Sequence, residues 1–398
     1  MFALDQAKDT AHAKVTSHQD ELINLSHEVW DHPELAFEEE HAAKVCADVL
    51  SGAGFDVTMG IAGLPTAFVA EYGSGPLTIG ICSELDALPG IGHACGHNMI
   101  AAAGVGAGLG LMELADDAGI TIRVYGTPAE EGGGGKIIML EDGAFDGIHA
   151  SMMVHPAPHE MDTFTTLASN SCEYHFHGKN AHASMAPWEG RNALDAVTIA
   201  QVAMGLLRQQ LPPHNQVHGM VTDGGLASNI IPAHAAAKYQ VRAPTVTELH
   251  PLEDRVRKCF EAAALATGCD LEVVRSMGAP YSEFRHDDGL VGFYRSNAEA
   301  LGRVFGPPSV GASTDMANLS LIMPTIHPII GLECDGAVNH QPEFAQHCRT
   351  EQADKGMLEG AISMAQTVID AAHDETTRNR LLAGNTTYGG RDNYPWQA

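Results

Sequence analysis

The stretch Ser83–Asn98, which reads SELDALPGIGHACGHN, decides the interpretation of this 398-residue chain. It lies where a strand pattern, Leu77–Ser83, gives way to a helix pattern, Asn98–Asp117, for which Asn98 is a suitable N-cap. In open α/β sheets, ligands bind outside the carboxyl ends of the strands, which is the position of this stretch. We therefore expect a functional site here, built on an α/β sheet.

Cys95 and His97 flank a single glycine within this stretch, so both side chains can turn toward one point. A thiolate and an imidazole together suit zinc or a similar borderline metal. The alternative interpretation is a helix N-terminus that contains a structural cysteine and a capping asparagine. The pair alone does not decide between the two.

Three further segments place metal-ligand side chains after predicted strands. Gly126–Lys136, GTPAEEGGGGK, carries the adjacent carboxylates Glu130 and Glu131, and on an extended turn one can bind a metal while the other faces a reacting water. The alternative is an exposed acidic turn, which the glycines disfavour because they allow close approach of a backbone or ligand. The other two segments contain His155 and His340, each of which also fits a core or turn histidine. Together the four segments could hold two metals bridged by a thiolate and a water, with Glu130 as general base.

The pattern along the chain predicts two domains. Strands and helices alternate up to about residue 165 and again after about residue 277, as in an α/β sheet covered by helices. Between them, the order β-α-β-β-α-β is typical of a ferredoxin-like unit. We therefore predict a discontinuous α/β domain, 1–165 and 279–398, with an inserted α+β domain, 166–278. Other predicted elements include helices over 14–30 and 37–50 and a strand over 325–331.

Charge and composition exclude some classes of partner. The chain has 22 Lys and Arg against 50 Asp and Glu, a net charge of −28, so neither a general nucleic-acid footprint nor docking on an anionic membrane is expected. The longest small-apolar run, Met99–Met112, is shorter than the roughly 20 residues that a membrane span needs. The N-terminus lacks a signal-like apolar region, and the eight cysteines are scattered, so we expect reduced thiols in a cytoplasmic protein.

These motifs, in this order, resemble the M20 metallopeptidase/amidohydrolase family over nearly the whole chain. HACGH (His93–His97) resembles the aminoacylase/hippurate-hydrolase branch. Three features, HACGHN, the preceding SELDALPG and ASTDMAN (Ala312–Asn318), are similar to the aminobenzoyl-glutamate hydrolase and β-alanyl-lysine dipeptidase-like group. Asn98 stands where the family more commonly has Asp.

The resemblance implies a zinc-exopeptidase-like catalytic α/β domain with two divalent metal ions per chain, zinc foremost and manganese or cobalt as alternatives. Cys95 would bridge the two metals. Glu131 and His340 would complete one metal site, and His97 and His155 would complete the other.

The resemblance also implies roles outside the metal ligands. Glu130 would be the general base and then the proton donor, and Asp86 would orient a ligand histidine or serve only as a turn residue. His182 would reach an active site, which in several family members is that of the partner subunit, and polarise the scissile carbonyl there. Asn229 would bind polar groups of the substrate. Arg242 could pair with a substrate carboxylate or be a surface residue. The inserted domain would act as a lid and dimerisation domain in a homodimer or higher homo-oligomer.

The predicted function is metal-dependent hydrolysis of the amide bond in a small N-acyl amino acid, an aminobenzoyl-glutamate-like conjugate or a dipeptide. One alternative is a catalytically inactive relative that keeps the fold as a binding or dimerisation module. Another is a two-metal hydrolase of phosphate esters, which the lack of an Arg or Lys cluster near the motifs disfavours.

Overall fold

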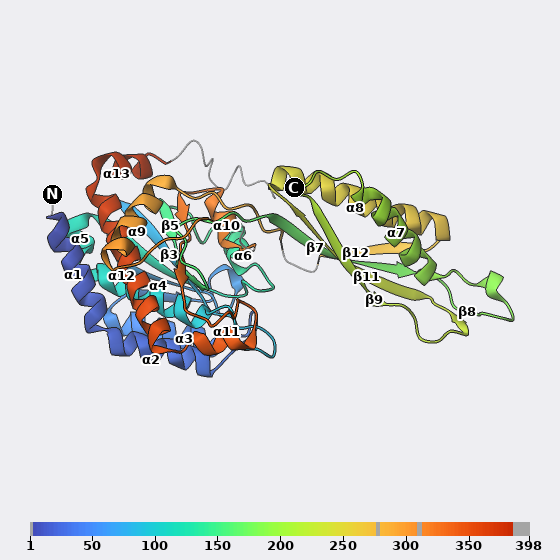
Figure 1. Ribbon diagram of the computed structural model, residues 1–398, viewed down its shortest axis with the longest axis horizontal. Helices are drawn as coiled ribbons and strands as arrows, with labels where there is room; N and C mark the ends of the chain where they lie inside the picture. The colour runs from blue at the N-terminus through green and yellow to red at the C-terminus, as the bar shows by residue number, and fades with distance from the viewer. Residues whose placement is uncertain (1–2, 276–278, 309–312, 385–398) are drawn as a thin grey trace. The chain divides into compact units, whose positions relative to one another are not determined.

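The computed structural model describes residues 3–275, 279–308 and 313–384. Two compact units share the chain (Figure 1): a larger one, up to residue 165 and from 284 onward, and a smaller one over 166–283. The sequence predicted the second boundary at residue 278, but the chain rejoins the larger unit only at 284. Hydrogen bonds hold the intervening described residues to the smaller unit. Ser169 and Tyr281 exchange two backbone hydrogen bonds of 2.9 Å, and Val246 N donates to Glu283 Oε2 at 2.9 Å.

A six-stranded sheet forms the centre of the larger unit, in the order β1-β2-β4-β3-β5-β13. Its strands are β1 (Asp56–Met59), β2 (Phe68–Gly73), β3 (Leu77–Glu84), β4 (Ile120–Thr127), β5 (Ala150–Met152) and β13 (Thr325–Ile326). The last four run parallel to one another, and β1 and β2 add an antiparallel edge. β3 is almost wholly buried, as expected for a central parallel strand that is covered on both faces. The parallel strands therefore end together at one edge of the sheet.

The strand predicted over 325–331 is two strands in two sheets. After β13 the chain passes through Pro328 and continues as β14 (Ile329–Gly331), which pairs with β6 (His155–Ala157) in a separate two-stranded parallel sheet. Proline has no backbone N–H to donate to a ladder, so a break at this position is expected. The break leaves His327 between the two strands.

Helices surround the sheet of the larger unit (Figure 1). They are α1 (Leu4–Ser17), α2 (Gln19–Asp31), α3 (Glu40–Ala53), α4 (His97–Leu111), α5 (Ala115–Ala118), α6 (Gly135–Asp142), α9 (Asp288–Ala300), α10 (Met316–Ser320), α11 (Pro342–His347), α12 (Glu351–His373) and α13 (Glu375–Leu382). The helix predicted over 14–30 is in fact α1 and α2, which meet at His18. The helix predicted from Phe37 begins at Glu40, because Phe37 has a φ of 65°, which an α-helix does not allow.

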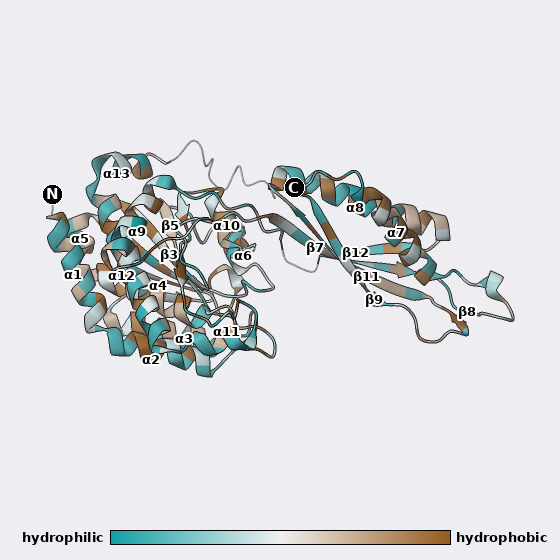
Figure 2. Ribbon diagram, viewed as in Figure 1, coloured by the Kyte–Doolittle hydropathy of each residue, from teal (hydrophilic) through white to brown (hydrophobic). Residues whose placement is uncertain are grey.

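Every residue of α4 is buried, and its small residues explain how this is possible. A side chain at Gly104 would place its Cβ 2.1 Å from Ser83 Oγ, and one at Gly106 would place its Cβ 2.9 Å from Leu22 Cδ1. The helix therefore lies close to β3 on one side and to α2 on another. Among the described residues, His97–Ala118 is the one helical stretch long and apolar enough to cross a membrane. Its most apolar 18-residue segment is 89% buried inside the fold. Figure 2 shows the hydrophobic residues of α4 and β3 at the centre of this unit.

Asn98 is not the N-cap of α4, contrary to the sequence prediction. The helix begins one residue earlier, after Gly96, whose φ of 76° only glycine adopts readily. Asn98 lies buried in the first turn, where its Nδ2 donates to Ser26 Oγ and to Cys348 O, both at 2.9 Å. Its role is to tie α4 to α2 and to the end of α11.

The smaller unit has the predicted ferredoxin-like order. Its main elements are β7 (Ala168–His177), α7 (Ala193–Arg208), β9 (Gln216–Asp223), β11 (His234–Ala243), α8 (Val246–Thr267) and β12 (Asp270–Arg275). The four strands form an antiparallel sheet in the order β12-β7-β11-β9, and the short β8 (Ala181–His182) pairs with β10 (Ile230–Ile231). Phe260 of α8 stacks on Tyr174 of β7 with ring centroids 3.7 Å apart, which anchors the helix on the sheet.

Candidate active site

The chemistry-bearing residues of the larger unit follow the carboxyl ends of its parallel strands. Asp86 comes after β3, Glu130 and Glu131 come after β4, and His155 comes after β5. His327, which the sequence analysis did not single out, comes after β13. Because these strand ends meet at one edge of the sheet, side chains from distant segments share one region.

Asp86 is a buried carboxylate that joins two of these segments. Its Oδ1 accepts hydrogen bonds from His97 Nδ1 at 3.2 Å and from Glu130 N at 3.0 Å, and its Oδ2 accepts one from Glu131 N at 2.9 Å. Burial alone would raise the pKa of Asp86, but the hydrogen bonds from His97 and the two backbone amides lower it. Asp86 therefore stays ionised, fixes the ring of His97 and holds the turn that carries both glutamates.

A strained turn presents Glu130 and Glu131. Ala129 has a φ of 58°, unusual for a residue with a side chain, and its N donates to the buried Glu39 at 2.9 Å. Two of the glycines that follow make room for protein, since a Cβ at Gly133 would lie 2.3 Å from the Phe37 ring and one at Gly135 would lie 2.0 Å from Pro128 O, whereas a Cβ at Gly132 would meet nothing within 4 Å. Such strain persists only where neighbouring contacts hold it, which Glu39 and Asp86 do here.

The predicted metal ligands fall into two groups that share Cys95. Cys95, His97 and His155 offer one ligand atom each within 4.8 Å of one another, and so do Cys95, Glu131 and His340. Cys95 Sγ lies 3.4 Å from His155 Nε2, and Glu131 Oε2 lies 3.3 Å from His340 Nε2. The structure thus brings all five predicted ligands together, in the two sets that the sequence analysis expected.

Three observations test whether this region suits metal cations. His97 Nε2, Glu84 Oε2 and Glu131 Oε1 are buried and make no hydrogen bond to the described residues. His97 Nε2 faces Glu84 Oε2 at 3.4 Å and Glu131 Oε1 at 3.8 Å. Burial raises the pKa of the Cys95 thiol, and the charge of Glu131 raises it further, so a thiolate here needs an adjacent cation. Three buried polar atoms without hydrogen-bond partners among the described residues, next to a thiol, fit a pair of borderline divalent metals.

Glu130 is buried beside the ligand groups. Burial raises the pKa of Glu130 well above its ordinary value, and the charges of Glu84 and Glu131 raise it further. Burial would also raise the pKa of Glu131, but the hydrogen bond from His340 and the charge of His97 outweigh this effect and lower it. The two neighbouring glutamates therefore differ in character. Glu130 is suited to take up a proton, and Glu131 is suited to stay ionised.

A buried ion-pair cluster behind the site was missed by the sequence analysis. Lys136 Nζ lies 2.6 Å from Glu84 Oε1 and 2.7 Å from Asp315 Oδ1, and all three side chains are fully buried. Burial alone would lower the pKa of Lys136, but the two carboxylates raise it, so it remains a cation. The three residues come from distant segments, and no spacing in the sequence signals their pairing. The Ala312–Asn318 motif that contains Asp315 begins at a residue outside the described part.

A cavity of about 220 Å³ opens onto the ligand groups. Its lining residues are Cys95, Glu130, Glu131, His155, Ala157, Met161, Phe164, Ser313, Thr314, His327, Ile329, Asn339 and His340. None of these described residues is Lys or Arg, which disfavours a phosphate-ester substrate. Asn339, also missed, donates from Nδ2 to Pro156 O at 3.0 Å and lies 3.8 Å from Cys95 Sγ.

The other predicted site residues lie in the smaller unit. His182 is exposed, and its Nδ1 accepts from Ser184 N at 3.3 Å, so its Nε2 is left to face solvent. Asn229 is its neighbour, because Asn229 O accepts from Ala183 N at 3.0 Å. Arg242 lies near the carboxyl end of β11, paired in register with Ser169 of β7, whereas Asn229 precedes the start of that strand. The structure therefore brings His182 and Asn229 together but leaves Arg242 apart from both.

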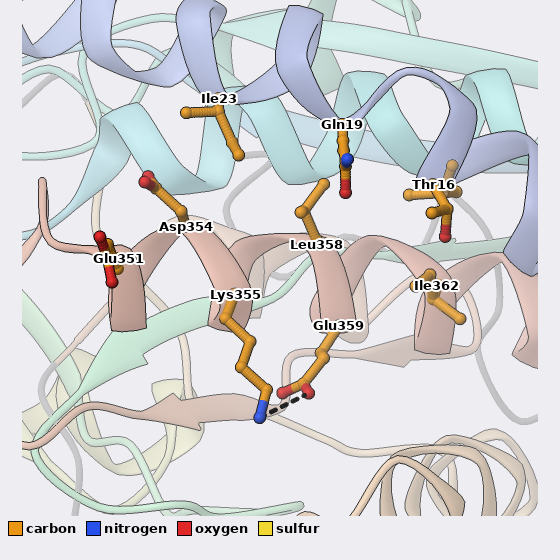
Figure 3. Close-up of a pocket in the computed structure, with 10 residues that line it drawn as sticks. Thr16, Gln19, Ile23, Glu351, Asp354, Lys355, Leu358, Glu359 and Ile362 are labelled. Atoms are coloured by element: carbon orange, nitrogen blue, oxygen red, sulfur yellow. Dashed lines mark ion pairs between the residues drawn. The ribbon is translucent and has the colours of Figure 1, made fainter.

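A second hollow of the larger unit carries no comparable chemistry. Figure 3 shows a groove beside α12, lined by Ile23, Leu358 and Ile362, with Lys355 and Glu359 forming an ion pair at 3.7 Å. Its acidic lining residues are Glu351, Asp354 and Glu359, and none of them belongs to the described groups of close metal-binding side chains. The cavity at the strand ends is therefore the candidate active site.

Comparison with known proteins decides the family. The Xaa-Arg dipeptidase of Mus musculus is 36% identical over 390 residues, which cover 92% of this chain and 89% of that protein. This chain belongs to the M20 peptidase family. One of the p-aminobenzoyl-glutamate hydrolase subunits of Escherichia coli is 36% identical over 270 residues, 63% of this chain and 56% of that protein. The peptidase dimerisation domain of the M20 family matches residues 167–267, within the smaller unit.

A solved M20 structure shares the fold. A dinuclear metal-binding peptidase from Bacillus subtilis superposes with a TM-score of 0.67 at 20% identity, covering 89% of this chain and 99% of that one. The predicted family and fold class are thus confirmed, and the M20 chain described here is an enzyme that hydrolyses amide bonds. The comparisons give no support to the hypothesis of an inactive binding module.

Proposed function

We propose that this M20 enzyme holds two divalent metal ions, zinc foremost and manganese or cobalt as alternatives, and hydrolyses a small N-acyl amino acid or dipeptide. The observation that carries the proposal is the thiol of Cys95, which belongs to both ligand groups, with Glu130 buried beside them. The relatives are named for Xaa-Arg dipeptides and for p-aminobenzoyl-glutamate, and a structural neighbour is named as dinuclear. These names support two metals and an amide between an acyl group and an amino acid.

In such a site, divalent metals supply Lewis acidity, which polarises a carbonyl and makes a water easier to deprotonate. The residues of the chain do the rest. Glu130 accepts a proton from the attacking water and returns it to the nitrogen of the leaving amine, which its raised pKa suits. Asp86 keeps His97 and the Glu130–Glu131 turn in position. His182 donates a hydrogen bond from its outward Nε2 to the carbonyl oxygen as charge develops there.

Metal analysis of a matched pair of cysteine variants tests the ligand assignment. Cys95→Ala is expected to lose both bound metal and activity, because its thiolate serves both groups. Cys348→Ala is the control: Cys348 is also buried, but among the described residues its Sγ donates only to Phe344 O, at 3.4 Å. A Cys95→Ala enzyme that still holds two metals per chain would refute the bridging role.

A substrate panel tests the reaction itself. Metal-loaded enzyme should hydrolyse N-acyl amino acids, aminobenzoyl-glutamate or dipeptides with a basic C-terminal residue, with release of a free amine. The relatives support each of these classes, and their ranking comes from kcat/KM. Turnover of phosphate esters alone, or of none of the panel, would overturn the proposal.

We also infer a homodimer formed through the smaller unit. Ile199, Val202 and Leu206 form an exposed apolar stripe on one face of α7, and the neighbouring edge strand β9 exposes Met220. Figure 2 shows hydrophobic residues along α7. An apolar helix face beside an unpaired strand edge suits a second copy of the same surface.

Mixed dimers show whether His182 acts in the partner's site. Glu130→Gln and His182→Ala subunits should each be inactive alone. If His182 acts across the dimer, a mixture of the two forms dimers in which one site keeps both residues, and activity returns. No recovery from verified mixed dimers would place His182 in its own subunit's site.

We further infer a cytoplasmic location, which the eight free cysteines support.

A further inference from the structure

His327 is a buried histidine that no motif explains. It lies between β13 and β14, is 2% exposed, and lines the cavity at the active site. Neither of its ring nitrogens has a hydrogen-bond partner among the residues that the structure describes. A neutral imidazole carries one donor and one acceptor, and buried polar groups in folded proteins nearly always have partners. An unsatisfied histidine that lines a cavity therefore points to a ligand that enters it.

The surroundings of His327 show what kind of group could satisfy it. Its ring lies 5.6 Å from that of His155, one of the proposed ligands, and 5.2 Å from that of Phe164. The apolar wall of the cavity consists of Ala157, Met161, Phe164 and Ile329, and Ser313 and Thr314 add hydroxyl groups to the lining. His327 is thus placed between the metal ligands and an apolar wall.

The charges of the cavity decide which half of the substrate enters it. Its only described carboxylates are Glu130 and Glu131, both at the end with the metal ligands, and none of its described residues is Lys or Arg. In the proposed substrates, the amino-acid half carries a carboxylate, which would find no cationic partner on this wall. The acyl half therefore occupies the cavity, and it is uncharged there.

Size adds a further limit. An apolar cavity of about 150 Å³ is large enough to bind benzene. The 220 Å³ found here therefore suits one flat ring with a small substituent.

We propose that His327 is a specificity-determining residue, which hydrogen-bonds the polar substituent of an uncharged, flat acyl group seated against Met161, Phe164 and Ile329. The inference rests on the proposed amide hydrolysis and deepens it by naming the acyl group that the site prefers. It predicts that a single polar substituent on the ring raises kcat/KM through this one contact.

The test compares two substrates that differ by one group, N-benzoyl-glutamate and N-(4-aminobenzoyl)-glutamate, with metal-loaded enzyme. Wild type should prefer the amino compound about tenfold in kcat/KM, the size of one buried hydrogen bond. His327→Phe keeps an aromatic ring among Phe164 and Phe284 but removes the hydrogen bond, so the preference should fall to about one. His327→Gln, which retains a donor and an acceptor, should restore most of it.

A control and a second readout separate this role from a structural one. His286→Gln changes another histidine of the same aromatic cluster that does not line the cavity. Because glutamine can keep the hydrogen bond that His286 Nε2 makes with Phe164 O at 3.0 Å, this variant should keep the wild-type preference. Metal content should stay at two per chain in every variant. An unchanged preference in His327→Phe, or loss of metal from it, overturns the inference.

The failure of the proposed function looks different. It would appear as a metal-loaded wild type that hydrolyses no amide in the panel. A wild type that hydrolyses other amides but neither benzoyl compound, or does not distinguish them, overturns the inference about His327 alone.

Discussion

Asp86→Asn is the substitution that tests the architecture of the site most directly. The asparagine fits in the same space, and its Oδ1 can still accept from His97 and from Glu130 N, as Asp86 Oδ1 does. Its amide nitrogen then replaces Oδ2, which accepts from Glu131 N at 2.9 Å in the native protein. Two donors would face each other, so one charge-assisted hydrogen bond is lost and a buried N–H is left unpaired.

The expected magnitude follows from that single lost contact. A hydrogen bond to a charged group contributes about 1.5–3 kcal/mol, which is roughly a 10- to 100-fold change in an equilibrium constant. Losses of metal affinity of this size, about 10- to 100-fold, are usual when the partner of a metal ligand is removed. Because the lost hydrogen bond is the one to Glu131, the metal proposed for Glu131 and His340 should bind more weakly, while the metal proposed for His97 and His155 should bind with close to native affinity.

The assay is competition for zinc with a chromophoric chelator, which resolves the two binding steps. Asp86→Asn should weaken one step by about 10- to 100-fold, and Asp86→Ala should weaken both steps because it also releases His97. Asp287→Asn is the control, since Asp287 is a buried aspartate that caps α9 and pairs with Arg380 at 2.6 Å. Two native affinities in Asp86→Asn would refute the assignment of Asp86 as the residue that positions Glu131.

Three further predictions concern the base, the buried ion pair and the dimer. Glu130→Gln should lower kcat by about 10²–10⁴ with two metals retained, measured by turnover and metal analysis, and near-native turnover would remove Glu130 from the mechanism. Lys136→Met leaves Glu84 and Asp315 buried without their cation. Urea denaturation should therefore show a loss of about 3–5 kcal/mol in the free energy of unfolding. A loss below about 1 kcal/mol would contradict the burial of this cluster. Leu206→Glu places a charge on the apolar stripe of α7, and light scattering should then show monomers, whereas an intact dimer would locate the interface elsewhere.

The parts of the site that the sequence predicted share one physical basis. Side chains that follow parallel strands meet at one edge of the sheet, so Cys95, Glu131 and His155 could be placed together from the order of strands and helices alone. The ferredoxin-like order of the smaller unit was predictable for a similar reason, because strands and helices differ in the spacing of their apolar residues.

The parts that were missed depend on contacts between distant segments. Lys136 meets Glu84 and Asp315 only after β3, α6 and α10 have packed, and nothing local marks that pairing. Asn98 was assigned as a cap from its position before a helix pattern, but the left-handed Gly96 starts the helix earlier and leaves the asparagine inside. His327 was hidden in a run that alternates like a strand, and only the break at Pro328 shows that it faces a cavity.

The five proposed metal ligands all lie in the larger unit, whereas His182 and Asn229 lie in the smaller one. The proposed metal ligands and these two proposed substrate contacts are therefore encoded in separate stretches of one gene. A mutation in residues 166–283 can alter a proposed substrate contact without removing a proposed metal ligand. Substrate preference can therefore change during evolution while the metal site is kept. The insertion that divides the catalytic unit in sequence also leaves the inserted part free to diverge.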